Sequence, residues 1–318
     1  IPATNLLQKH DFDYRFEAAG IPVWVQPGNH DINIPSPVGF TASGWYTVPA
    51  VDEEAFQDIY RHFMLESAEG ANFSYAVPVS DQLWLAVTDV AYYKEQAQTF
   101  GVYTAGHSRW LRQVLEEAKA QGVEVITSSH QNLIAHTSFS RDSYLMLGSE
   151  SMAALAREYG LRLHLSGHLH IQHIAVDGQL YDAATGAFCL WPHRYAIVTL
   201  AEDGTLSYEA RQLSDSLLPE GLAESSRDWF FSLTKERSAA SLAAYSLSEE
   251  AVELMSDYAA RFNLAYFAGV YRNGDLRWTE DPAYTLWAAL EGEGFSGYLQ
   301  LVQHEYNEEN LRLQLERR

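Results

Sequence analysis

The stretch Val23-Trp24-Val25-Gln26-Pro27-Gly28-Asn29-His30-Asp31 runs from apolar residues into a glycine turn that carries three consecutive polar side chains. The apolar residues of 21–26 predict a short buried strand. Side chains at the end of a buried strand are held on a rigid support and face a loop, where chemistry is commonly presented. We therefore identify Asn29, His30 and Asp31 as the first candidate site residues.

Two later segments repeat this arrangement of an apolar run followed by histidine. They are Ser128-Ser129-His130-Gln131-Asn132 and Gly167-His168-Leu169-His170. Imidazole nitrogens and the carbonyl oxygen of Asn bind borderline divalent cations such as zinc, manganese and iron. Residues two apart on a strand point to the same face, so we expect His168 and His170 to face one site together. Three strand ends that deliver histidines and Asn29 indicate a metal site.

Helices and strands are predicted to alternate through the first half of the chain. The hydrophobic periodicity predicts helices at 3–19, 52–63, 108–121 and 149–159, and strands at 73–79, 83–88, 123–127 and 161–165. Residues 32–51 are punctuated by Pro and Gly and predict a long loop, which either shapes a substrate pocket or only connects two elements. Polar residues at the ends of strands that alternate with helices are typical of an α/β fold.

After His170 the pattern changes to short alternating strands. Asp177-Gly178 and Asp203-Gly204 are signals of β-hairpin turns. An α/β region that ends in such an antiparallel meander favours two packed sheets over one doubly wound sheet.

The helical period returns beyond Leu213. Ser248-Glu249-Glu250 predicts the start of one helix. We therefore predict two domains, an α/β domain over residues 1–213 and a helical domain over residues 214–318. The helical tail has no cluster of metal-binding residue types, and it could dock a partner or a second copy of the chain.

Composition excludes several classes of partner. The chain has 318 residues with 21 basic and 42 acidic side chains, so its net charge of −21 argues against a long nucleic acid. A small phosphate ester is not excluded, because bound cations dominate the local field of a site. No apolar run approaches the roughly 18–20 residues that span a bilayer. The single cysteine, Cys189, excludes an internal disulfide and is expected to be a buried small hydrophobe.

The first residue is Ile1 rather than Met, and the sequence opens on a helix-like stretch with no signal sequence to read. We expect an N-terminus that is processed, truncated or incompletely represented. The compartment, cytoplasmic or exported, is left open by this sequence.

Accident is a poor explanation for these motifs. Gly-Asn-His-Asp arises by chance in roughly 2 chains in a thousand, at about one chance in twenty for each letter. The order of Gly28-Asn29-His30-Asp31, His130 and Gly167-His168-Leu169-His170 resembles the calcineurin-like metallophosphoesterase superfamily. The loop after the first motif and the helical tail look most similar to its bacterial class III cyclic-nucleotide phosphodiesterase-like branch. The resemblance covers roughly residues 1–210.

The superfamily pattern has five blocks, and this chain shows the last three. The Asp-x-His and Gly-Asp blocks would precede the helix expected at 3–19, and the sequence does not contain them there. The resemblance implies a two-sheet α/β/β/α sandwich with a dinuclear metal centre. It also makes residues 1–213 a metallophosphoesterase domain that is incomplete at its N-terminus.

The resemblance assigns metal ligands residue by residue. Asn29, His130 and His168 would bind the second of two divalent ions, and His170 would bind the first. The ions could be Mn, Fe or Zn, since these ligands suit all three. Four neutral ligands cannot offset two dications, so anionic ligands must come from the absent blocks. Without them, we expect the chain to hold metal poorly.

The activity implied by the resemblance is hydrolysis of phosphate esters, in particular phosphodiesters such as cyclic nucleotides. Two cations lower the pKa of bound water towards about 7 and supply hydroxide. His30 would protonate the leaving oxygen or donate to the phosphate, with Asp31 orienting its ring. Two alternatives stay open: a Ser/Thr protein phosphatase or phosphomonoesterase, and a binding module with the same fold and no catalysis.

Other polar residues carry weaker predictions. His136 and His193 are expected to be structural rather than in contact with substrate, and Tyr46 is an unranked candidate in the loop. Asp89, at the end of an expected strand, could face the site, but a carboxylate that caps a turn is the favoured interpretation.

Overall fold

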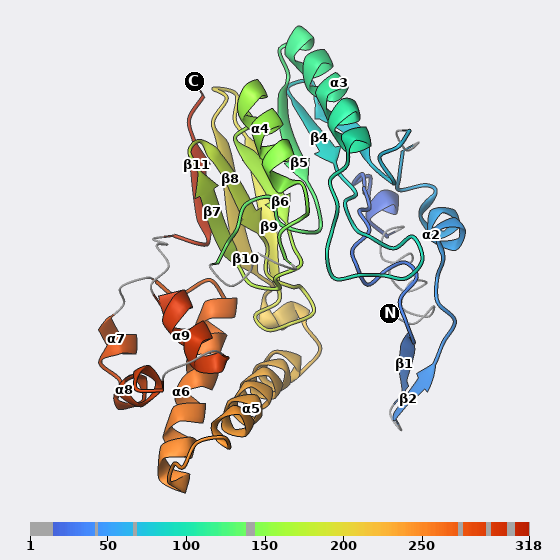
Figure 1. Cartoon of the computed structure of the whole chain (residues 1–318). Coiled ribbons are helices and arrows are strands. Elements are labelled where there is room, and N and C mark those ends of the chain that lie inside the picture. The colour runs from blue at the N-terminus through green and yellow to red at the C-terminus, as the bar shows by residue number, and fades with distance from the viewer. Residues whose placement is uncertain are drawn as a thin grey trace. The chain divides into compact units, whose positions relative to one another are not determined.

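The chain forms two compact units in a computed structural model (Figure 1). The structure describes residues 15–41, 44–65, 69–137, 144–272, 276–290, 294–303 and 309–317. The first unit comprises residues 1–134, 142–168 and 176–182, and the second comprises 135–141, 169–175 and 183–318. Within the described ranges, the helices are too short or too polar to cross a bilayer.

A six-stranded sheet organises the first unit. Its strands lie in the order β3 (Tyr75–Ser80), β4 (Leu83–Val87), β5 (Glu124–Ser128), β6 (Leu163–Ser166), β8 (Leu180–Ala184) and β7 (His173–Asp177). β4, β5 and β6 are parallel, with Leu83 opposite Glu124 and Thr127 opposite His164. Parallel neighbours end at the same edge of a sheet, so this pairing brings three of the predicted strand ends together. The α/β prediction is confirmed.

Two helices pack on this sheet, α3 (Ala105–Gln121) and α4 (Ser149–Tyr159). They lie side by side (Figure 1), and their apolar faces form one core with residues of β4 and β5. Thr104 caps α3 by accepting from the His107 N–H, and Gly122 ends it at a φ of 71°. α3 therefore begins three residues before the predicted start at 108, because its capping box uses histidine where the usual pattern has Glu or Gln.

The helix predicted after Asp52 is confirmed as α2 (Glu53–Tyr60). The Asp52 carboxylate accepts from the Ala55 N–H at 2.8 Å, which satisfies one of the donors at the helix start. The helix predicted at 3–19 falls mostly outside the described residues, and only its last turn, at 15–18, is described as helical.

The prediction of a strand at 21–26 is wrong, because these residues form neither a strand nor a helix. Its backbone bonds to a loop and to side chains instead of a neighbouring strand: Val25 N–H donates to Phe63 O (3.0 Å), and the Tyr75 hydroxyl donates to Val25 O (2.6 Å). The Gln26 side chain donates to Thr88 O (2.9 Å) and Ser128 O (3.3 Å), beyond β4 and at the end of β5. A side chain thus fixes the segment to the sheet.

The loop predicted at 32–51 contains a hairpin, β1 (Val38–Thr41) and β2 (Gly44–Thr47). A Cβ on Gly39 would lie 2.5 Å from Cζ of Tyr46, so the tyrosine ring covers the glycine opposite it. Strands this short pair only with each other, and the surrounding Pro and Gly residues hide them from periodicity.

The second unit contains a three-stranded antiparallel sheet in the order β11 (Arg312–Leu315), β10 (Leu206–Gln212), β9 (Arg194–Leu200). The hairpin turn predicted at Asp203-Gly204 is confirmed, with Thr205 N–H donating to the Asp203 carboxylate at 2.8 Å. β11 is a strand that the prediction of a helical 214–318 lacks, because its partner β10 is distant in sequence. The domain boundary between 213 and 214 stays a prediction.

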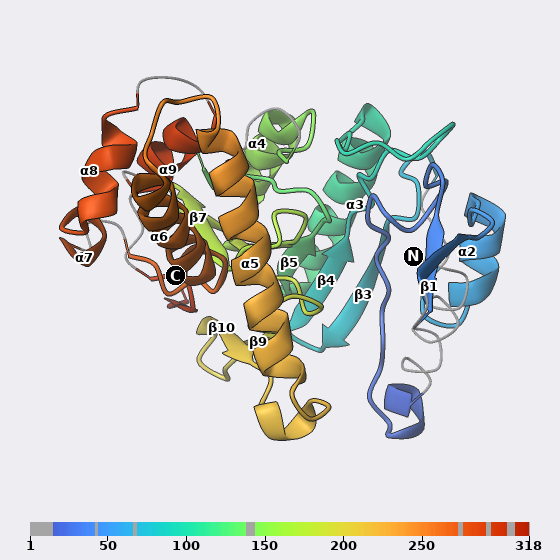
Figure 2. The ribbon, with the colours of Figure 1, turned by 90° about the horizontal axis from the view of Figure 1, so that it is seen from below.

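The described helices of the second unit include α5 (Leu222–Leu242), α6 (Glu249–Phe267), α7 (Leu276–Thr279), α8 (Pro282–Ala288) and α9 (Phe295–Gln303). α5 and α6 lie side by side (Figures 1 and 2). Ser248 begins α6 as predicted, since its hydroxyl accepts from the Ala251 N–H at 3.2 Å.

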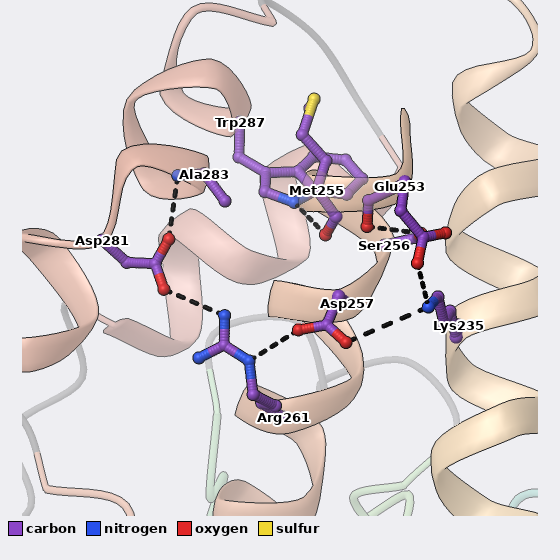
Figure 3. Close-up of polar contacts among 9 residues, drawn as sticks. All are labelled: Lys235, Glu253, Met255, Ser256, Asp257, Arg261, Asp281, Ala283 and Trp287. Carbon is purple, nitrogen blue, oxygen red and sulfur yellow. Dashed lines mark hydrogen bonds and ion pairs between the residues drawn. The ribbon is translucent and has the colours of Figure 1, made fainter. Parts of the chain in front are cut away.

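A chain of alternating charges joins α5, α6 and α8 (Figure 3). We call Glu253, Lys235, Asp257, Arg261 and Asp281 the charge chain. Lys235 bonds Glu253 at 2.6 Å and lies 4.0 Å from Asp257, while Arg261 bonds Asp257 at 2.8 Å and Asp281 at 3.0 Å. Asp281 also caps α8. Every member of the charge chain therefore contacts an oppositely charged side chain or the start of a helix.

Cys189 is exposed, which corrects the expectation of a buried cysteine. It lies in a turn after β8, where Leu190 N–H donates to Ala187 O at 3.1 Å. The apolar residues 187–191 around it predict a packed segment, but they form a loop.

Candidate metal centre

The parallel pairing of β4, β5 and β6 continues past the ends of these strands. Backbone hydrogen bonds link Thr88 N to Ser128 O (2.8 Å), Ser129 N to Leu165 O (3.0 Å), and Gly167 N to His130 O (3.0 Å). The loops that carry His130 and His168 are therefore tied to each other at one edge of the sheet.

The Gly28–Asp31 turn is closed by its own aspartate. The Asp31 carboxylate accepts from the Gly28 N–H at 2.8 Å, and the Asp31 N–H donates to Gly28 O at 3.3 Å. The turn buries Asn29 and leaves His30 exposed. Asp31 thus holds the backbone of the turn, and its predicted orientation of the His30 ring stays a prediction.

Gly28 allows this turn to approach His130 closely. A Cβ on Gly28 would lie 2.8 Å from Cε1 and 2.9 Å from Nδ1 of the His130 ring. Carbon atoms pack at about 3.5–4.0 Å, so any side chain at position 28 would displace the ring. Asn29, the next residue, reaches His130 because of this approach.

Three side-chain atoms converge at the strand ends. Oδ1 of Asn29 lies 2.7 Å from Nε2 of His130, and Nδ1 of His168 lies 3.2 Å from the same Nε2. Ligands at about 2.0–2.1 Å from one zinc ion lie about 2.9–3.4 Å from each other at octahedral or tetrahedral angles. Both separations are therefore close to the spacing of neighbouring ligands on one cation, and we call the three atoms the donor set.

His168 and His170 do not lie on a strand, which corrects the sequence prediction. β6 ends at Ser166, and the two histidines have φ values of 63° and 61° in the left-handed region. Alternation along a strand therefore cannot place them on one face. His170 belongs to the second unit, where its carbonyl accepts from the Ala187 N–H at 3.3 Å. The contacts described above bring together Asn29, His130 and His168.

The donor set contains no acidic side chain. Within the described ranges, no three His, Cys, Asp or Glu side chains form a group that could hold a metal ion. Two imidazoles and one amide can supply lone pairs to a divalent cation, but they cannot balance its charge. The donor set fits part of a metal site and requires anionic ligands from other residues.

Tyr144 belongs to none of the sequence motifs, and its ring centroid lies 5.3 Å from that of His168. Tyr144 also contacts the segment after His130, because its carbonyl accepts from the Asn132 N–H at 3.1 Å. Tyr144 lies beside both loops because of contacts with residues distant in the sequence, and a short sequence motif cannot indicate such contacts.

His164 is a second residue that the motifs did not indicate. The Ser129 hydroxyl donates to Gln131 O (2.6 Å), so it accepts from Nε2–H of His164 (2.8 Å). Nδ1 of His164 lies 2.8 Å from the Thr127 hydroxyl. This buried imidazole fixes Ser129, the residue before His130.

Asp89 caps a turn, as the favoured interpretation predicted. Its buried carboxylate accepts from Phe73 N–H (3.2 Å), Ala91 N–H (3.1 Å) and the Tyr93 hydroxyl. Burial raises the pKa of Asp89 to about 7, against the lowering effect of these hydrogen bonds. His107 donates to Asp89 O at 2.7 Å, and burial lowers the pKa of its imidazole.

The remaining candidates have contacts of their own. Nδ1 of buried His136 contacts Nδ1 of His173 at 3.0 Å within the second unit. Nδ1–H of His193 donates to Phe188 O at 2.9 Å. Tyr46 lies in the β1–β2 hairpin against Gly39.

Comparison with known proteins gives one family. A model described as calcineurin-like phosphoesterase matches residues 4–172, more than half of the 318-residue chain. No curated protein matches the sequence.

Several solved structures are similar at low identity. A dimetal phosphatase from Danio rerio has 13% identity and a TM-score of 0.46, with 67% of this chain and 78% of that chain covered. GAP50, the anchor in the inner membrane complex of Plasmodium, has 13% identity and a TM-score of 0.37, with 70% and 88% covered. A putative 5′-nucleotidase from Staphylococcus aureus has 14% identity and a TM-score of 0.34, with 56% and 39% covered.

Proposed function

This chain belongs to the calcineurin-like phosphoesterase family, whose members generally use two divalent cations, and we propose that it hydrolyses phosphodiesters such as cyclic nucleotides. The convergence of Asn29, His130 and His168 beside the exposed His30 is the observation that carries the proposal.

Asn29, His130 and His168 would hold one cation, and His170 would contribute to the other. When bound, the cations supply Lewis-acid stabilisation of the phosphoryl oxygens and a hydroxide at neutral pH. The protein orients its own donors for this task. Nε2 of His130 now donates to Asn29 Oδ1, so His130 binds a cation through Nε2 only with its proton on Nδ1.

His30 is the proposed acid. Its exposed imidazole follows Asn29 directly, so a substrate near the donor set comes within its reach. An N–H of His30 would donate to the leaving oxygen and offset the negative charge that develops there. The hydrogen bonds between Asp31 and Gly28 fix the backbone from which His30 extends.

Metal analysis of the full chain, combined with hydrolysis of bis(p-nitrophenyl) phosphate and p-nitrophenyl phosphate in Mn²⁺, tests this proposal. We expect weak but saturable binding of added Mn²⁺, since the donor set contains no carboxylate, and a kcat/KM for the diester at least about tenfold above that for the monoester, a difference of about 1.4 kcal/mol in transition-state binding. Preference for the monoester would indicate a phosphomonoesterase or protein phosphatase instead. A chain with no bound metal and no hydrolysis of either ester would be a binding module.

A further inference from the structure

Asp182 lies at the centre of the hydrogen bonds behind the donor set. It is on β8, fully buried, and no motif includes it. Its Oδ2 accepts from Leu133 N–H (2.7 Å) and Ile134 N–H (2.9 Å), and its Oδ1 accepts from the Ser166 hydroxyl (2.6 Å). One carboxylate therefore binds two separate segments of the first unit.

These two segments carry the histidines of the donor set. Leu133 and Ile134 belong to the loop that begins at His130, and Ser166 ends β6 two residues before His168. Asn132 joins the same group of bonds, since its Nδ2 donates to the Ser166 hydroxyl at 2.7 Å. The Ser166 hydroxyl thus accepts from one histidine loop and donates to the carboxylate that holds it.

The donor set needs such restraint. Three lone-pair atoms that point at one place repel each other unless a proton or a cation lies between them. Residues behind a metal site commonly fix the orientation of its ligands, and their loss weakens metal binding about 10–100-fold. A carboxylate that accepts several hydrogen bonds at once is a strong restraint, because charge-assisted bonds are roughly twice as strong as neutral ones.

We propose that Asp182 is a positioning residue, which holds the loops of His130 and His168 at the spacing needed to bind one divalent cation. The inference rests on the proposed function, since it assumes that these histidines bind metal. Asp182 itself touches neither the cation nor the substrate.

Asp182→Asn tests the proposal. Its amide oxygen can keep the bonds to Leu133 and Ile134, whereas its NH₂ group replaces the acceptor for Ser166. Asp177→Asn is the matched control, because Asp177 is an exposed carboxylate of the same β7–β8 hairpin that pairs with Arg157. The full chain is titrated with Mn²⁺ by calorimetry, and diester hydrolysis is measured across Mn²⁺ concentrations.

For Asp182→Asn we expect Mn²⁺ affinity to fall about 10–100-fold. The Mn²⁺ concentration at half-maximal hydrolysis should rise equally, while kcat at saturating Mn²⁺ stays within about threefold of the original chain. A residue that only stabilised the fold would not produce this separation. Asp177→Asn should leave both quantities unchanged.

Mn²⁺ affinity in Asp182→Asn equal to that of the original chain would overturn the positioning role and leave the proposed function intact. An original chain that neither binds Mn²⁺ nor hydrolyses the diester would overturn both. If circular dichroism shows that Asp182→Asn does not fold, Ser166→Ala decides instead. It removes the side-chain link that Ser166 makes between Asn132 and Asp182 and keeps the Asp182 bonds to the backbone, so unchanged Mn²⁺ affinity there also overturns the proposal.

Discussion

Polar side chains gather in two regions of this molecule that differ in how charge is balanced. In the charge chain of the second unit, acidic and basic groups alternate, and each has an opposite neighbour within 4.0 Å. In the donor set of the first unit, Asn29, His130 and His168 bring lone pairs together without an opposite charge among them. The charge chain balances its own charges, whereas the donor set would be completed by the cation of the proposed function. This difference would separate a stabilising cluster from a metal site.

Replacing a histidine of the donor set should have the largest effect on metal binding and hydrolysis. His168→Ala is expected to lower bound metal to background and diester hydrolysis by on the order of 100-fold or more, because a ligand matters more than the residues behind it. Metal analysis and hydrolysis rates of the purified chain measure both effects. Asp257→Asn, in the charge chain, is the control and should retain metal. Full metal content in His168→Ala would remove His168 from the donor set.

Removing the proposed acid should separate catalysis from binding. His30→Ala is expected to keep its metal and lose about 10²–10⁴-fold in kcat, the usual contribution of a general acid. His62→Ala, at another exposed histidine, serves as the control for both measurements. If His30→Ala loses metal together with activity, His30 acts as a ligand and not as the acid.

Crowding the donor set without removing a donor should give a smaller effect. Gly28→Ala places a Cβ 2.8 Å from the His130 ring, so we expect about tenfold weaker metal binding and about 1–3 kcal/mol lower stability. Gly167→Ala is a matched control, since its Cβ would meet His130 only at 3.7 Å. Calorimetry and urea unfolding test the pair, and equal behaviour of the two variants would contradict the close-approach argument.

Breaking the charge chain should have the smallest effect. Asp257→Asn removes one carboxylate from a partly exposed network, so the free energy of unfolding should fall by about 0.3–1 kcal/mol. Urea unfolding at low and high salt measures this change, and the difference should shrink as salt screens the pairs. A decrease of several kcal/mol in the free energy of unfolding would contradict the small contribution expected for a partly exposed network.

Local chemistry made much of the fold predictable. Asp52 and Ser248 begin helices by accepting from backbone N–H groups a few residues later, and Asp203-Gly204 lies in the short turn between β9 and β10. Asn29 and His130 could be assigned to one site because each follows an apolar run and a family motif contains both. Each of these features depends on residues that are close together in the sequence, so it can be predicted from the sequence alone.

Contacts between distant segments were not predictable in this way. β11 pairs with β10, and Asp182 binds loops that lie about 16–50 residues before it. The 21–26 segment looked like a strand because its residues are apolar, yet its bonds go to Tyr75 and Phe63. In each case the residue that makes the contact lies far away in the sequence. The periodicity of hydrophobic residues over a short segment therefore cannot indicate the contact.

The left-handed backbone at His168 and His170 bears on any attempt to make this protein more robust. Such a conformation costs about 1–2 kcal/mol for a residue with a Cβ, and glycine adopts it freely. Selection for thermal tolerance alone would therefore favour glycine at both positions, even after the larger unfolded-state entropy of glycine is counted. A version of the chain improved in that way would survive heating better and would have discarded the imidazoles. Under the proposed function, metal binding by these two imidazoles is obtained at that cost in stability.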